Sequence, residues 1–245
     1  MPLIDRQKFD AIYDSYIIQD GFSETAEYYR IEKPRFRRSL ELLCGLGILE
    51  SANLLEIGGG QLAIVVNKLF GTSCSVADIS DRYVAPLTKA GVGFFEYNLL
   101  ENPPADRQAR YDVVVLLEVI EHVPAPAAVV LERLKRFLKP KGVIFLTTPN
   151  LFRLRNLTRM ILGVEFLDHF MIPRPGELPG HQLEYSADHL RWQIARANMT
   201  TVLLEHDEFG RTGHSFATRM ARTLLAPLTL RRKWRDGLVA VIGQQ

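Results

Sequence analysis

The sequence contains 245 residues, of which 47% are hydrophobic and 24% are charged, and its formal net charge is +2. A chain of this length buries one full core, and its nearly balanced charge argues against a nucleic-acid binder with a large basic face. Cys44 and Cys74 lack metal-ligand spacing, the N-terminus is too charged for a signal peptide, and no apolar run approaches membrane-spanning length. We therefore expect a cytoplasmic protein with reduced cysteines and no nucleic-acid partner.

Helical periodicity dominates residues 1–50. Phe9 and Tyr13 recur at the spacing of one helical turn, and Pro34 suits the first turn of a second helix. We expect these residues to form an N-terminal helical cap in front of a larger domain that spans residues 51–245.

Short apolar runs alternate with amphipathic stretches from Asn53 onward. The runs that predict strands are NLLEI, CSVAD, VGFFEY, YDVVVLL, VIFLTT, TTVLLEH and GLVAVIG, with the last one expected at an edge of the sheet. Runs that are apolar on both faces and separated by helices predict a mostly parallel sheet covered on both sides. The expected fold is α/β, Rossmann-like and doubly wound, with seven strands and an insertion at about 151–185.

Three consecutive glycines, Gly58, Gly59 and Gly60, follow the first predicted strand. Together with Ala63 they fit the relaxed dinucleotide pattern G-x-G-x-x-G/A, and Asp78 ends the second strand at about the expected 20-residue spacing. The pattern is short, so it fits three alternatives: the pyrophosphate of NAD, a different nucleoside cofactor, or a turn that only lets strand and helix pack.

Glu56, two positions before the first glycine, favours one of these ligands. A carboxylate at the carboxyl end of a strand repels a pyrophosphate and attracts an ammonium group. S-adenosylmethionine carries an amino group and a sulfonium at one end, and at the other a ribose diol from which Asp78 can accept hydrogen bonds. The two acids together favour S-adenosylmethionine over NAD.

Taken together, these motifs resemble the class I S-adenosylmethionine-dependent methyltransferases, and within them the small-molecule and ubiquinone-type O-methyltransferase branch. The shared features over residues 53–199 are E-x-G-x-G, the acid after the second strand, E-H-V after the fourth strand and L-K-P-x-G before the fifth. The resemblance implies an enzyme that transfers a methyl group to a small acceptor. A hydroxyl of a metabolite, a quinone-like ring or a glycan precursor is the expected acceptor.

The resemblance also implies which residues bind the cofactor: Glu56, Gly58, Gly59, Gly60, Asp78, Ile79, Asn98 and Glu118. Ile79 is expected to pack on the adenine, Asn98 to accept from its amino group and Glu118 to border the sulfonium. Leu62 occupies the family's third glycine position, where it is expected to narrow the pocket beside the methionine chain. This departure leaves open a non-catalytic scaffold that binds S-adenosylmethionine, and an NAD-dependent oxidoreductase is the weaker alternative.

The sequence Glu118-Val-Ile-Glu121-His122 follows the fourth strand, at the edge where open α/β sheets bind ligands. In one interpretation Glu118 contacts the cofactor while Glu121 and His122 fix the loop through hydrogen bonds. In a second, His181 joins these three residues in a Mg²⁺ or Mn²⁺ site, similar to the metal-binding set of certain RNA 2′-O-methyltransferases. In a third, His122 or His181 acts as a metal-free general base. Glu121, His122 and His181 are therefore the candidate catalytic residues.

Two basic segments follow the fifth predicted strand. Arg153, Arg155 and Arg159 suit either a solvated helix face or contact with an acidic group of the acceptor. The segment 216–235 mixes apolar and basic side chains, so it either packs on the sheet or lies on an anionic membrane surface. The second interpretation predicts a peripheral membrane contact and a lipid-linked acceptor.

Overall fold

The computed structural model describes residues 4–19, 22, 24–49, 51–168, 171, 174, 180–209, 220, 223–224 and 226–244. Within them, seven strands form one sheet in the order β3-β2-β1-β4-β5-β7-β6. The strands are β1 (Asn53–Ile57), β2 (Ser73–Asp78), β3 (Gly93–Glu96), β4 (Tyr111–Leu117), β5 (Leu138–Pro149), β6 (Met199–Asp207) and β7 (Gly237–Gln244). β1 to β5 are parallel, whereas β7 runs antiparallel to both of its neighbours. The predicted fold class is confirmed.

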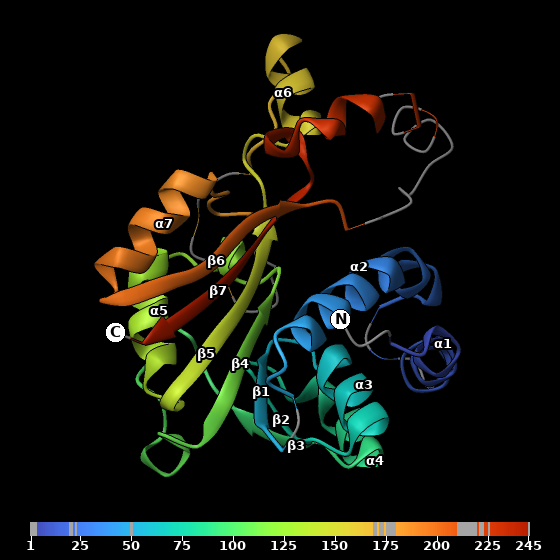
Figure 1. Ribbon diagram of the computed structural model, residues 1–245, viewed down its shortest axis with the longest axis vertical. Helices are drawn as coiled ribbons and strands as arrows, with labels where there is room; N and C mark the ends of the chain where they lie inside the picture. Colours follow the sequence, from blue (N-terminus) through green and yellow to red (C-terminus); the bar gives the residue numbers. More distant parts are fainter. Residues whose placement is uncertain are drawn as a thin grey trace.

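Helices cover both faces of the sheet (Figure 1). One face carries α1 (Arg6–Tyr13), α2 (Ala26–Gly45), α3 (Gln61–Phe70) and α4 (Val84–Ala90), and the other carries α5 (Ala127–Lys135) and α7 (Ala187–Arg196). The remaining helix, α6 (Leu154–Ile161), projects beyond the end of the sheet. Short helical turns are η1 (Asp14–Gln19), η2 (Asp81–Tyr83), η3 (Ala105–Arg107), η4 (Ile120–His122), η5 (Ala226–Leu230) and η6 (Arg232–Trp234). None of the described helices combines the length and the apolar character needed to span a bilayer.

Alternate residues of each central strand face the two helical layers. In β4, Val113 and Val115 belong to the core beneath α1 to α4, whereas Val114 and Leu116 pack with α5 and α7. All four side chains are fully buried. Burial on both faces is the physical reason for an uninterrupted apolar run in a parallel strand.

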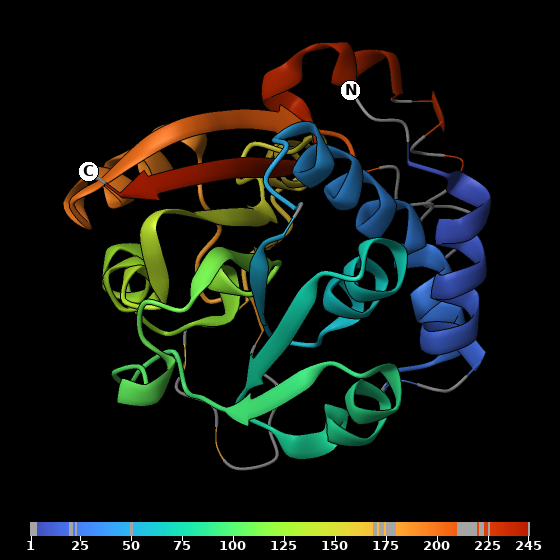
Figure 2. The ribbon, with the colours of Figure 1, turned by 60° about the horizontal axis from the view of Figure 1, so that its bottom comes forward.

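The N-terminal helices share a core with the sheet. Leu40 and Leu43 of α2 lie in the same hydrophobic cluster as Leu54 of β1, and Figure 2 shows these helices beside α3. A charged contact adds to this packing, because Arg38 of α2 donates to both carboxylate oxygens of Asp207 in β6 at 2.7–3.1 Å. The N-terminal helices are therefore attached to the sheet by both apolar and ionic contacts.

The position of Pro34 differs from the prediction. The second helix begins at Ala26, where the Thr25 hydroxyl accepts a hydrogen bond of 3.2 Å from the Tyr28 amide, so Pro34 lies inside α2. An interior proline removes one helical hydrogen bond and costs about 3 kcal/mol. Burial of one face of α2 against the sheet offsets this cost.

The last strand is also misplaced in the prediction, because GLVAVIG does not form an edge. β7 lies between β5 and β6 and is buried along nearly its whole length. A strand apolar on both faces needs neighbours on both sides, whereas β6, with several exposed positions, tolerates the edge.

Candidate functional site

The predicted site residues gather at the carboxyl ends of the parallel strands. The connections that leave β1 and β4 run to opposite sides of the sheet, so a crevice between these two neighbouring strands is the expected ligand position. The glycine turn follows β1, Asp78 ends β2, and Glu118 follows β4.

The glycine turn requires glycine for conformational reasons. Gly58, Gly59 and Gly60 all have positive φ angles, of 81°, 73° and 116°. A Cβ on Gly60 would lie 2.7 Å from Leu87 Cδ2, and one on Gly58 would lie 2.9 Å from Val119 Cγ2. The turn therefore brings bare backbone to the crevice, as close approach of a ligand demands.

Glu56 has a structural function that the sequence did not suggest. Its side chain is buried, and Oε2 accepts a hydrogen bond of 2.6 Å from the Ala63 amide. Because Gly60 at the start of α3 has no side chain to cap the helix, Glu56 satisfies an amide group of its first turn. Burial raises the pKa of Glu56 to about 7, although these backbone hydrogen bonds and the charge of Arg35 oppose the shift.

The residues expected at the nucleoside end of the cofactor lie together after β2 and β3. Asp78 Oδ2 accepts from the Gly59 amide at 3.1 Å, which connects the acid to the glycine turn. The next residue, Ile79, is 68% exposed and offers an apolar surface to a planar ring. Asn98 is adjacent, because the Tyr97 amide donates to the Asp78 carbonyl at 2.9 Å.

Leu62 does not line an open pocket. Its side chain is fully buried in the core cluster shared by the N-terminal helices and the sheet. The expectation that it narrows the space beside the methionine chain rested on its motif position, whereas the helix that starts at Gln61 directs it into the core.

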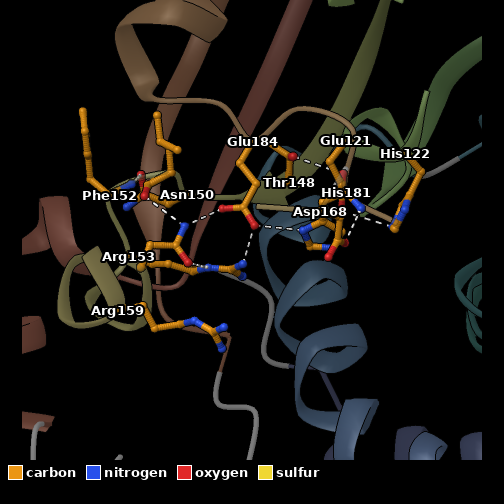
Figure 3. A network of polar contacts seen from close by, with 12 residues as sticks. Glu121, His122, Thr148, Asn150, Phe152, Arg153, Arg159, Asp168, His181 and Glu184 are labelled. Atoms are coloured by element: carbon orange, nitrogen blue, oxygen red, sulfur yellow. Dashed lines mark hydrogen bonds and ion pairs between the residues drawn. The ribbon is translucent and has the colours of Figure 1, made fainter. Parts of the chain in front are cut away.

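Glu121, His122 and His181 lie together although one of them is far away in the sequence (Figure 3). The Glu121 carbonyl accepts from the amides of Gln182 and Leu183, which fixes the segment carrying His181 against η4. His122 Nδ1 lies 3.1 Å from the Gly180 carbonyl, and the two imidazole rings pack edge to face with centroids 4.9 Å apart. The hydrogen bonds of Glu121 and His122 hold this loop in place, as the first interpretation of the motif expects of these two residues.

The same three residues have the geometry of a metal-ligand group. One ligand atom from each of Glu121, His122 and His181 lies within 4.8 Å of the others. Glu118, the fourth predicted ligand, is not part of this group in the described structure; it follows β4 with a left-handed φ of 57° and its amide donates to the Thr147 carbonyl.

The carboxyl group of Glu121 lies in an unusual environment. It is fully buried, and Oε2 accepts a hydrogen bond of 3.1 Å from the Thr148 hydroxyl. Burial, followed by repulsion from Glu118, raises the pKa of Glu121 well above its ordinary range. Such a carboxyl group holds a proton more readily than a surface acid does, which suits either proton transfer or binding of a cation.

Arg35 is a candidate site residue that the sequence analysis missed. Its guanidinium group, on α2, is 5% exposed, and Nε lies 2.7 Å from Glu32 Oε2. Within the described residues, Nη1 is buried and has no hydrogen-bond partner. The charge of Arg35 opposes the rise in the pKa of Glu56 and of Glu121. Glu32 and Arg35 lie with Phe36 on the buried, mostly apolar face of α2. Charged residues on such a face were the sequence feature from which a buried ion pair could have been predicted.

Arg153 does not lie on a solvated helix face, which was one of its two expected environments. It is 6% exposed, and its guanidinium forms an ion pair with the buried carboxylate of Glu184. It lies at the start of α6, where the turn after β5 directs it inward.

Comparison with known proteins gives the family. The profile of the methyltransferase domain matches residues 26–204, which include β1 to β5 and most of β6. With the seven-stranded sheet and the glycine turn described above, this match identifies the class of protein: the chain belongs to the class I S-adenosylmethionine-dependent methyltransferase family.

The individual relatives agree with this assignment. Ubiquinone biosynthesis O-methyltransferases are 32% identical over 159 residues in Leptothrix cholodnii and 33% identical over 142 residues in Methylococcus capsulatus. These alignments cover 60% and 56% of this chain, and they span only 64% and 53% of the relatives' own lengths.

Solved structures show the same fold at low sequence identity. An S-adenosylmethionine-dependent methyltransferase from Mesorhizobium loti is 14% identical with a TM-score of 0.57, covering 87% of this chain and 98% of that one. The magnesium protoporphyrin IX methyltransferase of Synechocystis, solved with bound SAH, is 13% identical with a TM-score of 0.58, covering 98% and 94%.

The raised pKa of Glu56 predicts a dependence of stability on pH. The folded protein keeps a proton on Glu56 up to about pH 7, whereas the unfolded chain releases it near its ordinary pKa of 4.5. The free energy of unfolding therefore falls as the pH rises from about 4.5 to 7, by at most about 3 kcal/mol from this group. Urea denaturation across this range measures the slope, which should be shallower in Glu56→Gln.

Glu96→Gln, which changes an exposed glutamate on β3 of the same sheet, is the matched control and should keep the slope of the unsubstituted protein. An equal slope in Glu56→Gln would show that Glu56 titrates normally in the fold.

Proposed function

We propose that the protein is an enzyme that transfers a methyl group from S-adenosylmethionine to a hydroxyl group of a small molecule. The observation that carries the proposal is a pair of buried ionisable groups that interact through their charges: the carboxyl group of Glu56, just before the glycine turn, and the guanidinium of Arg35. An α-amino acid end presents an ammonium and a carboxylate, and these two groups complement it. A pyrophosphate would match only the cation.

The remaining cofactor residues support the same orientation of the ligand. Asp78 provides carboxylate oxygens for the two ribose hydroxyls, while Ile79 and Asn98 form an apolar and a polar contact for the adenine. The burial of Leu62 removes the reason for a scaffold without catalysis. The family assignment argues in turn against an NAD-dependent oxidoreductase.

The chemistry asks little covalent help from the protein. S-adenosylmethionine supplies a methyl group that is already activated on a sulfonium. The chain therefore contributes mainly by positioning the acceptor in line with that methyl group. Removal of the hydroxyl proton falls to His122 or His181, beside Glu121 at the acceptor end of the crevice.

A quinone-like ring is the acceptor class that we favour. The relatives are named for ubiquinone biosynthesis, and the exposed apolar residues around α6 suit an acceptor with an apolar substituent.

The buried, unpaired thiols of Cys44 and Cys74 support a reducing, cytoplasmic location.

Donor binding tests the charge pair directly. In calorimetry, S-adenosylmethionine should bind and NAD should not. Arg35→Gln should weaken donor binding by about 10- to 100-fold, because a hydrogen bond to a charged group contributes about 1.5–3 kcal/mol. Arg30→Gln, which changes an exposed arginine on the same helix, should leave the affinity unchanged.

Binding of NAD in place of the methyl donor would contradict the proposed function. A second outcome, donor binding without transfer of labelled methyl groups to any small molecule of a cell extract, would favour the scaffold.

We further propose that Glu121, His122 and His181 hold a Mg²⁺ or Mn²⁺ ion. The donor set fits, because one carboxylate and two imidazoles converge within 4.8 Å. Such an ion would lower the pKa of the acceptor hydroxyl. The charge of Glu118 close to Glu121 adds support, since a neighbouring cation relieves the repulsion between these two carboxyl groups.

Removal of the metal should separate catalysis from donor binding. Chelator treatment and Glu121→Gln should each abolish methyl transfer, while calorimetry with S-adenosylmethionine gives the same affinity as before. Added Mn²⁺ or Mg²⁺ should restore activity after chelation and not in the variant. Full turnover in excess chelator would rule out the metal and leave a histidine as the base.

A peripheral membrane contact is the partner that we propose. Ile161, the last residue of α6, and Leu162, which follows it, are 84% and 75% exposed, and Leu230 of η5 is 82% exposed. The basic residues Arg231, Arg232 and Lys233 follow directly, and Figure 1 shows η5, η6 and α6 at the same end of the molecule. Apolar side chains beside cations fit an anionic bilayer surface. Residues 216–219, 221, 222 and 225 of the predicted segment 216–235 lie outside the described residues.

Vesicle flotation tests this contact. The protein should float with vesicles that contain phosphatidylglycerol and less with pure phosphatidylcholine. Ile161→Ser/Leu162→Ser should reduce binding, whereas Val202→Ser, at an apolar position on the edge strand β6 that is 63% exposed, should not. Equal flotation of both variants would contradict a contact through α6.

A further inference from the structure

Glu184 is a buried carboxylate that connects α6 to the acceptor end of the site. It is 2% exposed, and Oε2 accepts a hydrogen bond of 2.6 Å from Asn156 Nδ2. Oε1 contacts both the Arg153 guanidinium and His181 Nδ1, the latter at 2.9 Å (Figure 3). A buried carboxylate costs several kcal/mol unless it is paired, and these three donors together provide the pairing.

The partners of Glu184 determine where the proton of His181 lies. A guanidinium and a side-chain amide nitrogen only donate hydrogen bonds, so both oxygens of Glu184 act as acceptors. The contact at Nδ1 therefore requires the hydrogen to be on Nδ1 of His181. In the neutral ring, Nε2 then carries the lone pair.

The ring of His181 is also fixed in direction. Its backbone amide donates to Asp168 Oδ2 at 2.8 Å, and the ring packs edge to face against His122. With Nδ1 occupied by Glu184, Nε2 is the nitrogen left for the group formed with Glu121 and His122. Either function of His181, proton acceptor or metal ligand, needs a lone pair on that nitrogen.

Stability alone does not explain this arrangement. Apolar residues of similar volume often replace a buried ion pair at little or no cost in stability. A carboxylate that selects one tautomer and one ring orientation has no apolar substitute, however, and such partners typically change activity or metal affinity by about 10- to 100-fold.

We infer that Glu184 is a positioning residue: held by Arg153 and Asn156 from α6, it locks His181 as the Nδ1–H tautomer with the Nε2 lone pair directed at the acceptor. The inference deepens the proposed function and rests on it for the consequence in catalysis. It also makes α6 part of the active site, because two of the three donors to Glu184 come from the start of that helix.

The tautomer can be observed directly. The full-length protein is labelled with ¹⁵N-histidine and studied by NMR at a pH of about 8.5, where an ordinary imidazole is neutral. His181→Gln assigns the signals. We expect a protonated Nδ1 and an unprotonated Nε2 for His181, and loss of this pattern in Glu184→Gln. Glu205→Gln, an exposed glutamate on β6, is the control and should leave the pattern unchanged.

A proton on Nε2 of His181 in the unsubstituted protein would overturn the inference, and that measurement does not depend on the folding of any variant. An unchanged His181 pattern in folded Glu184→Gln would overturn it equally. In methyl-transfer assays, Glu184→Gln should lower kcat by about 10- to 100-fold while the affinity for S-adenosylmethionine stays the same.

The two proposals fail in different ways. Absence of donor binding in the unsubstituted protein refutes the proposed function and leaves the NMR pattern intact. A wrong tautomer with normal donor binding refutes only the positioning function of Glu184.

Discussion

The hydrogen bond from the Ala63 amide to the Glu56 carboxyl joins the first strand to the first crossover helix. A turn of three glycines leaves α3 without a side-chain cap. Glu56, two residues before the first glycine, supplies the missing hydrogen-bond acceptor. The group that stabilises the start of α3 is thereby buried beneath the place where a cationic ligand would lie. In the function that we propose, helix capping and ligand recognition depend on the same carboxyl group.

The residues that we propose for the cofactor could be located in the sequence because they belong to local motifs, with the exception of Arg35. Glu56 and the three glycines occupy a single strand–turn–helix unit, and Asp78 ends the next strand at a characteristic distance. The alternating apolar pattern similarly predicts the sheet and its two helical layers. The prediction of the fold was wrong for Pro34 and for β7. Long-range packing decides whether a proline lies at the start or in the interior of a helix, and whether a strand lies at the edge or in the interior of a sheet.

The acceptor half could be predicted only in part, because its geometry comes from contacts between distant segments. The motif around Glu121 and the later His181 suggested a cluster by resemblance, and the backbone bonds from residues 182 and 183 to Glu121 create it. The sequence analysis did not single out Arg35, and it did not predict the buried ion pair of Arg153. In a sequence, an arginine destined for a buried ion pair looks the same as one on a solvated helix face, since the partner carboxylates lie on other turns or other elements.

The internal position of β7 has a consequence for the order in which the protein folds during synthesis. β6 joins the sheet only through β7, so neither β6 nor the outer edge of β5 has its strand partner until residues 237–244 emerge. At ribosomal rates, the interval between the synthesis of β5 and that of β7 lasts on the order of ten seconds. During this interval the apolar edge of β5 is open to aggregation. The parallel strands β1 to β5 have all of their mutual partners before β7 is synthesised, whereas the antiparallel pairs of β7 are the last that the chain can form.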